Sequence, residues 1–215
     1  MNKKSIIAAA VLALSASLSR ADVTFTFSQV GADVVMTSSG TLNTANLLSS
    51  SYGDGWGGTG IENNATAGDI DIMGGTSFGG IDTLFKFNSG TNASAITTPN
   101  GPFSFSNFGW AVTSGSTSFS TYSGFLGGFR QPGIGMRAAD IISGLWTPNQ
   151  NWINTSGTFA SLGLNLGTYA VSDRLTGETI TIQVGESRVP DGGTTLALLG
   201  GTFLGLAALR RRFVS

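Results

Sequence analysis

Any chemistry in this chain must come from carboxylates, hydroxyls and aromatic rings, because its 215 residues include no histidine and no cysteine. Histidine is the usual general base at neutral pH and the commonest metal ligand. Cysteine would supply a thiol nucleophile, a thiolate zinc site or a disulfide, and a serine nucleophile needs a neighbouring base. We therefore expect no catalytic residue, no metal and no cofactor, and expect that the protein is not an enzyme.

The acidic residues that lie closest together in the sequence are Asp69 and Asp71, with Asp54, Glu62 and Asp82 nearby. Oxygen ligands of this kind hold Ca²⁺, and paired carboxylates hydrolyse glycosides. The chain has no Asp-x-Asp-x-Asp-Gly loop, and alternating acids in a strand usually mark its solvent-exposed face. We interpret Asp69 and Asp71 in this way, and a carboxylate-based glycosidase is kept as a less favoured alternative.

A glycine-rich segment at residues 51–58 contains Tyr52 and Trp56. Aromatic rings in such a loop could stack on sugar rings, although a surface loop with its tryptophan folded back over a sheet is the simpler interpretation. A carbohydrate-binding module is therefore an alternative function. Its glycan contacts would be Tyr52 and Trp56, with further platforms among Trp110, Trp146 and Trp152.

The charge of the central part of the chain excludes one class of partner. Residues 22–188 contain five basic and 11 acidic residues, so this body carries a net charge of about −6. Nucleic acids require clustered lysine and arginine, and we expect no nucleic-acid partner.

The N-terminus has the pattern of a secretory signal peptide. Lys3 and Lys4 precede an apolar run at residues 6–14, and small residues precede a cleavage position between Ala21 and Asp22. A basic start, a short apolar core and a small-x-small exit are typical of export signals. Residues 1–21 are predicted to be a signal helix that signal peptidase removes.

The C-terminus contains a motif, an apolar segment and a basic cluster, in that order. Val189, Pro190, Asp191, Gly192 and Gly193 form a turn-prone motif. The uncharged segment 194–209 follows, and as a helix its 16 residues would span about 24 Å, against about 30 Å for a hydrocarbon core. Three basic residues end it and place the C-terminus in the cytoplasm by the positive-inside rule: Arg210, Arg211 and Arg212.

On these residues the tail resembles the PEP-CTERM class of sorting signals, in the variant that begins Val-Pro-Asp-Gly-Gly. The resemblance covers residues 189–215 and implies a transient single transmembrane helix that an exosortase recognises and cleaves. It further implies a Gram-negative-type bacterium that makes exopolysaccharide. Asp191 and Gly192 replace the Glu-Pro of the name-giving motif, which points to a variant processing enzyme.

The body, residues 22–188, has the alternation of β-strands. Apolar residues recur at every second position in 23–28 and 178–184, and partner strands at 33–37 and 167–171 complete two predicted hairpins. Further strands are predicted at 69–73, 81–87 and 117–122, and a helix of one or two turns at 137–142. We predict a mainly β body, an antiparallel β-sandwich or jelly roll, between the two terminal helices.

The leading hypothesis is an exported bacterial protein of the cell surface or extracellular matrix. It would be anchored transiently in the inner membrane and processed by signal peptidase and an exosortase. The body is expected to be structural or adhesive, with exopolysaccharide as a candidate partner.

Overall fold

The computed structural model describes residues 22–51, 59–64, 69–75, 80–87, 101–122, 125–126, 129–130 and 132–185. The predicted signal helix at 1–21 and the predicted transmembrane helix at 194–209 lie outside these ranges. Among the described ranges, no helix has the length and hydropathy of a membrane span. The described part of the chain is mainly β.

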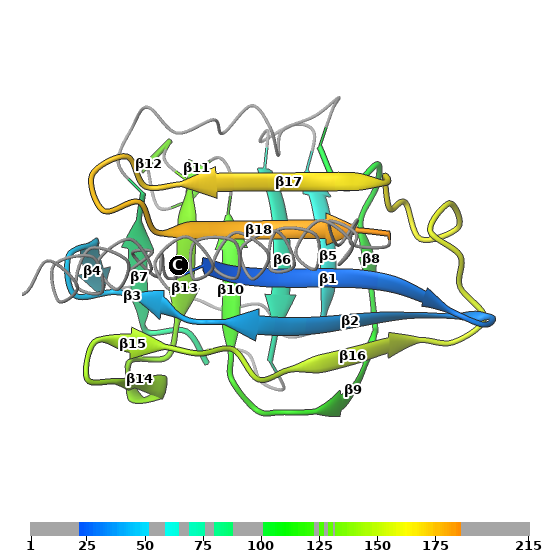
Figure 1. Cartoon of the computed structure of the whole chain (residues 1–215), viewed down its shortest axis with the longest axis horizontal. Helices are drawn as coiled ribbons and strands as arrows, with labels where there is room; N and C mark the ends of the chain where they lie inside the picture. Colours follow the sequence, from blue (N-terminus) through cyan, green and yellow to red (C-terminus); the bar gives the residue numbers. More distant parts are fainter. Residues whose placement is uncertain are drawn as a thin grey trace, which may run out of the picture. The chain divides into compact units, whose positions relative to one another are not determined.

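The first sheet has six strands in the order β17-β18-β1-β2-β16-β9 (Figure 1). The bounds of its strands are β1 (Asp22–Val30), β2 (Asp33–Gly40), β9 (Ala111–Ser114), β16 (Asn151–Asn154), β17 (Gly167–Ser172) and β18 (Thr179–Val184).

Both predicted hairpins are confirmed in this sheet. β1 and β2 pair antiparallel from Val23 to Val30 around a turn that contains Gly31, whose φ is +62°. In β1 the apolar residues Val23, Phe25 and Phe27 are fully buried, whereas the intervening hydroxyl residues are half-buried. β17 and β18 form the second hairpin. The period-two pattern therefore identified the buried face correctly.

One pairing departs from the expected antiparallel arrangement. β1 and β18 run parallel, with Phe25 opposite Ile182 and Phe27 opposite Val184. These two strands come from the opposite ends of the body, so no hairpin loop constrains their direction. The first and last described strands thus lie side by side inside the sheet.

The second sheet has seven strands in the order β4-β7-β13-β10-β6-β5-β8, and every described pairing in it is antiparallel. Predicted strands are confirmed as β6, β7 and β10, with shorter bounds for β7 and β10. The bounds are β4 (Leu48–Ser51), β5 (Gly60–Asn64), β6 (Asp69–Gly74), β7 (Thr83–Lys86), β8 (Asn107–Phe108), β10 (Phe119–Tyr122) and β13 (Gly133–Met136).

Short elements complete the described part, and they correct the predicted helix at 137–142. Only a 3-10 turn, η2 (Ala138–Asp140), forms there, and Ile141 is already extended. The two isoleucines enter a strand because β-branched residues favour it, and Ser143 and Gly144 supply the positive φ of a tight hairpin turn. The remaining strands are β3 (Leu42–Asn43), β14 (Ile141–Ile142), β15 (Leu145–Trp146), β11 (Phe125–Leu126) and β12 (Phe129–Arg130).

The two large sheets form a sandwich in which the strands of one sheet run across those of the other (Figure 1). Buried side chains from both sheets form one hydrophobic cluster between them. The predicted sandwich is thus supported, and the jelly-roll form remains a prediction.

Aromatic rings fill the middle of this core. The Phe119 ring stacks on Phe25, with 4.8 Å between centroids, and on Trp152 at 6.0 Å, and it meets Trp146 edge-on at 5.8 Å. Offset and edge-to-face contacts are the favourable geometries for aromatic pairs. These rings come from β1, β10, β15 and β16. They therefore join both large sheets and the three-stranded sheet β14-β15-β3.

A buried glutamine supplies two hydrogen bonds inside this core. Gln150 is fully buried, and its Oε1 accepts a hydrogen bond of 2.7 Å from Nε1 of Trp152. Its Nε2 donates to the carbonyl oxygen of Thr117. The Gln150 amide thus replaces the water molecules that the Trp152 indole N–H and the Thr117 carbonyl lose on burial.

Candidate functional site

Most of the sequence-predicted site residues lie outside the described residues. Ala21 of the signal cleavage position, the loop residues Tyr52 and Trp56, the motif 189–193 and the arginines 210–212 are among them. Asp22 is described and is the first residue of β1. The predicted roles of the undescribed residues remain predictions.

The boundaries of the β-body bear directly on processing. Its described strands all lie between Asp22 and Val184. The backbone N–H of Gly185 donates a 2.9 Å hydrogen bond to the carbonyl of Phe27, which ties the end of β18 to β1. Cleavage before Asp22 and within the motif 189–193 would therefore leave every described strand intact.

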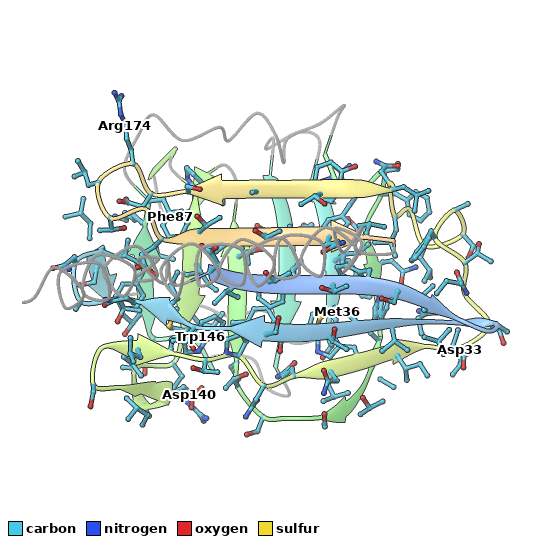
Figure 2. The ribbon with its side chains drawn as sticks, viewed as in Figure 1. Asp33, Met36, Phe87, Asp140, Trp146 and Arg174 are labelled. Carbon is cyan, nitrogen blue, oxygen red and sulfur yellow. The ribbon has the colours of Figure 1, made fainter. Side chains whose placement is uncertain are left out.

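The three tryptophans suggested as further sugar platforms are core residues, and this suggestion was wrong. Trp110 is 3% exposed, and Trp146 and Trp152 are completely buried. The Trp110 ring packs edge-on against Phe27 at 5.7 Å and lies 6.4 Å from that of Trp152. A ring that is packed on several sides inside the sandwich has no face left for a sugar. Figure 2 shows where Trp146 lies on its strand.

Of the two aspartates interpreted as solvent-facing, Asp71 is placed differently from the expectation, and the side chain of Asp69 lies outside what the structure describes. Asp71 is only 5% exposed, so the interpretation of this residue as solvent-facing was wrong. It lies directly opposite Glu62 on the neighbouring strand β5. Asp82 instead accepts a 2.7 Å hydrogen bond from the backbone N–H of Ala138. Within the ranges that the structure describes, no group of three or more potential ligands is gathered for a metal ion.

A surface cleft of about 490 Å³ lies in the described part of the chain. It lies where the segment before β8 meets the segment before β17, and the two segments are joined by a bridge between Phe103 and Leu164. The residues that line it are mainly apolar: Ser104, Phe105, Phe159, Ala160, Gly163, Leu164, Asn165 and Leu166. Ligand sites usually combine apolar walls with a few polar groups in this way.

One wall of the cleft depends on a glycine. Gly163 has a φ of +71°, and a Cβ at this position would lie 3.0 Å from three carbons of the Phe105 ring. The ring therefore rests directly on the glycine backbone, yet 46% of Phe105 remains exposed. This exposed aromatic face is the most ligand-like element of the cleft.

The polar groups of the cleft are bonded to one another. The Ser104 hydroxyl donates to Oδ1 of Asn165 at 2.9 Å, and Nδ2 of Asn165 donates to the Gly101 carbonyl at 2.8 Å. The backbone N–H of Ser104 also donates to the Gly163 carbonyl at 2.7 Å. These bonds fix the walls of the cleft, so its binding surface consists chiefly of apolar and aromatic groups.

Sequence reasoning did not identify this cleft. Phe105 and Leu166 lie about 60 residues apart, and no local pattern marks either of them. Their proximity follows from the bridge between Phe103 and Leu164, which is a long-range pairing. Such a site becomes visible only once the fold is known.

Glu178 is a buried acid whose carboxyl group has a raised pKa. Burial raises the pKa of its carboxyl group, and a 2.7 Å hydrogen bond from the backbone N–H of Asn43 to Oε2 acts in the opposite direction. The nearby carboxylates of Asp22 and Asp173 raise the pKa further. Because Oε2 joins the β17–β18 loop to β3, we assign Glu178 a structural role.

Comparison with known proteins gives one match, and it lies in the tail. Residues 188–213 match the family model described as the VPDSG-CTERM motif. The matched motif has serine where this chain has Gly192. Neither the curated proteins nor the solved structures include a match to this chain. The tail thus carries a PEP-CTERM-like sorting signal, which indicates an exported protein that an exosortase processes.

Proposed function

We propose that this protein is a structural or adhesive component of a bacterial cell surface or extracellular matrix, and that an exosortase delivers its β-sandwich there by cleaving the tail. The observation that carries the proposal is the sorting-motif match at residues 188–213, which begins three residues after Gly185. A membrane-embedded enzyme can act at this position without disturbing a strand. The proposal assigns no catalytic activity to the body.

The composition and surface of the body support this role. Its outward-facing residues on β1 and β18 are largely threonine and serine. A hydroxyl-rich sheet face on a cysteine-free, acidic sandwich suits a protein that must remain folded and hydrated outside the cell. Exopolysaccharide is the partner that we propose for this surface.

The test is intact-mass analysis of the protein made from the full chain in a host that has the matching exosortase. We expect the released protein to begin at Asp22 and to lack residues 194–215. In an exosortase deletion strain, the full tail should remain and the protein should stay in the membrane fraction. Pro190→Ala should reduce release, whereas Pro148→Ala in the body should leave it unchanged. Release with residues 194–215 still attached would contradict the proposal.

Carbohydrate binding is a second candidate, favoured by the exposed Phe105 ring in the cleft. Stacking of one sugar on an aromatic ring contributes roughly 0.5–1.5 kcal/mol beyond the area buried. Phe105→Ala should therefore weaken binding to a glycan array about two- to tenfold. Phe108→Ala, a comparably exposed phenylalanine (43%) outside the cleft, serves as the matched control. Trp56→Ala would show whether the loop at 51–58 is the platform instead. Turnover of a glycan that one acidic substitution abolishes would favour the glycosidase alternative.

A further inference from the structure

The six-stranded sheet ends in two outer strands, β9 and β17, each of which pairs on one side only among the described residues. An outer strand presents a row of N–H and C=O groups that can pair with another chain. Natural proteins prevent this with short strands, charged residues, prolines or bulges on the edge. The two outer strands differ sharply in these protective features.

The β9 edge is protected. It is four residues long, and its pairing with β16 shifts register between Asn151 and Trp152. A bulge of this kind bends and twists the edge away from a flat template. A second chain would find few consecutive backbone groups here in one plane.

The β17 edge has none of these protections. All six of its residues pair with β18 without a shift in register, and the strand contains no charged residue and no proline. Figure 1 shows β17 at the outer margin of the sheet. Its threonine, tyrosine and valine favour extended backbone. It therefore offers a neutral template that pairs in continuous register with β18.

Both ends of β17 are also fixed. Before the strand, the Tyr169 hydroxyl donates to the carbonyls of Asn165 and Leu166, at 3.2 and 3.3 Å. After it, Oδ1 of Asp173 accepts hydrogen bonds from the backbone N–H groups of Leu175 and Thr176, at 2.9 and 2.7 Å. The entropy of ordering this edge is thus already lost in the single chain, which lowers the cost of association.

We propose that β17 is a self-association edge at which a second copy of this chain pairs its own β17 antiparallel, so that two six-stranded sheets become continuous. A strand paired antiparallel with its own copy lies on a twofold axis, the symmetry of most homodimers. Because the β9 edge is protected, the joined sheet does not extend further through β9, and we expect a dimer. This interaction goes beyond the sorting function and does not depend on it.

The two faces of β17 restrict the register of this pairing. Thr168, Ala170 and Ser172 alternate with Tyr169 and Val171, of which Val171 is buried and Tyr169 packs against the core. Registers centred on Tyr169 or on Ala170 place the polar faces of the two β17 strands on the same side of the joined sheet. Either register places the two Ala170 Cβ atoms directly opposite or diagonal to each other, about 5–8 Å apart.

Electrostatics gives this association a distinctive salt dependence. Each body carries about −6, so two copies repel each other at low salt, and added salt screens that repulsion. The neutral backbone pairing at β17 is not weakened in return. We therefore expect the dimer fraction to rise with salt, the opposite of an association driven by complementary charges.

Site-specific cross-linking tests the proposal cleanly because the chain has no cysteine of its own. Ala170→Cys is introduced into the full chain, and Thr113→Cys on β9 is the matched control at the other edge. A short bismaleimide that spans about 8 Å is applied to the protein recovered from expressing cells. We expect a covalent dimer from the β17 variant and none from the β9 variant, whether or not the tail has been removed.

Lysine substitutions provide the complementary measurement. Ala170→Lys should reduce the mass found by light scattering twofold, from dimer to monomer, whereas Thr113→Lys should leave the dimer intact. Both variants lower the net negative charge equally, so a selective loss cannot arise from general repulsion. A monomeric unsubstituted protein, equal cross-linking at both edges, or a dimer that survives Ala170→Lys would each overturn the proposal.

Discussion

Replacing Gln150 by leucine is expected to destabilise the core through its hydrogen bonds and not through its volume. Leucine is similar in size but carries no polar group, so Nε1 of Trp152 and the Thr117 carbonyl both lose their buried partner. Each unsatisfied buried group costs about 1–3 kcal/mol, which gives roughly 2–6 kcal/mol in total. This is a large part of the roughly 5–15 kcal/mol that a typical domain has.

Urea denaturation followed by tryptophan fluorescence measures this loss as a lower midpoint with an unchanged m-value. Gln183→Leu is the matched control, because Gln183 lies on the outward face of β18 and is only half-buried. Its effect should stay within about 0.5 kcal/mol. In a thermal melt, Gln150→Leu should lower Tm by roughly 5–20 °C.

A double-mutant cycle separates the hydrogen bonds from the packing. Trp152→Phe removes the indole N–H but keeps a ring that can stack on Phe119. In the Gln150→Leu background no orphaned N–H is left, so the double variant should cost less than the sum of the single variants by about 1–2 kcal/mol. Additive effects, or an unchanged stability of Gln150→Leu, would refute the assignment of Gln150 as the hydrogen-bond partner of Trp152 and Thr117.

Two further predictions concern pH and backbone geometry. Because burial raises the pKa of Glu178, its contribution to stability is complete below the unfolded value of about 4.3 and is lost as pH rises through the folded value. Glu178→Gln keeps an acceptor for the Asn43 amide and should flatten this loss in melts recorded from pH 4 to 8, and an unchanged slope would exclude Glu178 as its source. Gly115→Ala combines a φ of +86° with a clash against the Asn149 carbonyl, whereas Gly31→Ala has a φ of +62° with nothing within 4 Å. We expect Gly31→Ala to cost about 1–2 kcal/mol in urea denaturation and Gly115→Ala clearly more, and equal losses would show that the Asn149 contact is relieved without cost.

Local pattern predicted the hairpins of the first sheet and the strands β6, β7 and β10, because alternation depends only on neighbouring residues. It failed for the region 137–142, where an apparent helix start became a 3-10 turn. There the β-branched Ile141 and Ile142 and the positive φ of Ser143 and Gly144 favoured a hairpin. The local sequence was compatible with both a helix and a strand, and the pairing of β14 with β15 selected the strand.

Long-range pairing and burial could not be predicted from the sequence. The parallel pairing of β1 with β18 joins strands about 150 residues apart, and nothing local encodes its direction. The burial of Trp110, Trp146 and Trp152 has the same origin, because a tryptophan in a loop-like sequence can lie on either side of a sheet. Asp71 shows the limit of the alternation rule, since the outward face of β6 is itself buried at this position.

The pairing of β1 with β18 also connects the fold to its export. β1 lies between β18 and β2, so the sheet is incomplete until the C-terminal strand β18 is in place. Non-local pairing of this kind must wait for the chain segments that close it. The sorting motif begins only a few residues after β18, so it directly follows the last described strand along the chain. Cleavage at this motif therefore falls after the last described strand and leaves the sandwich whole.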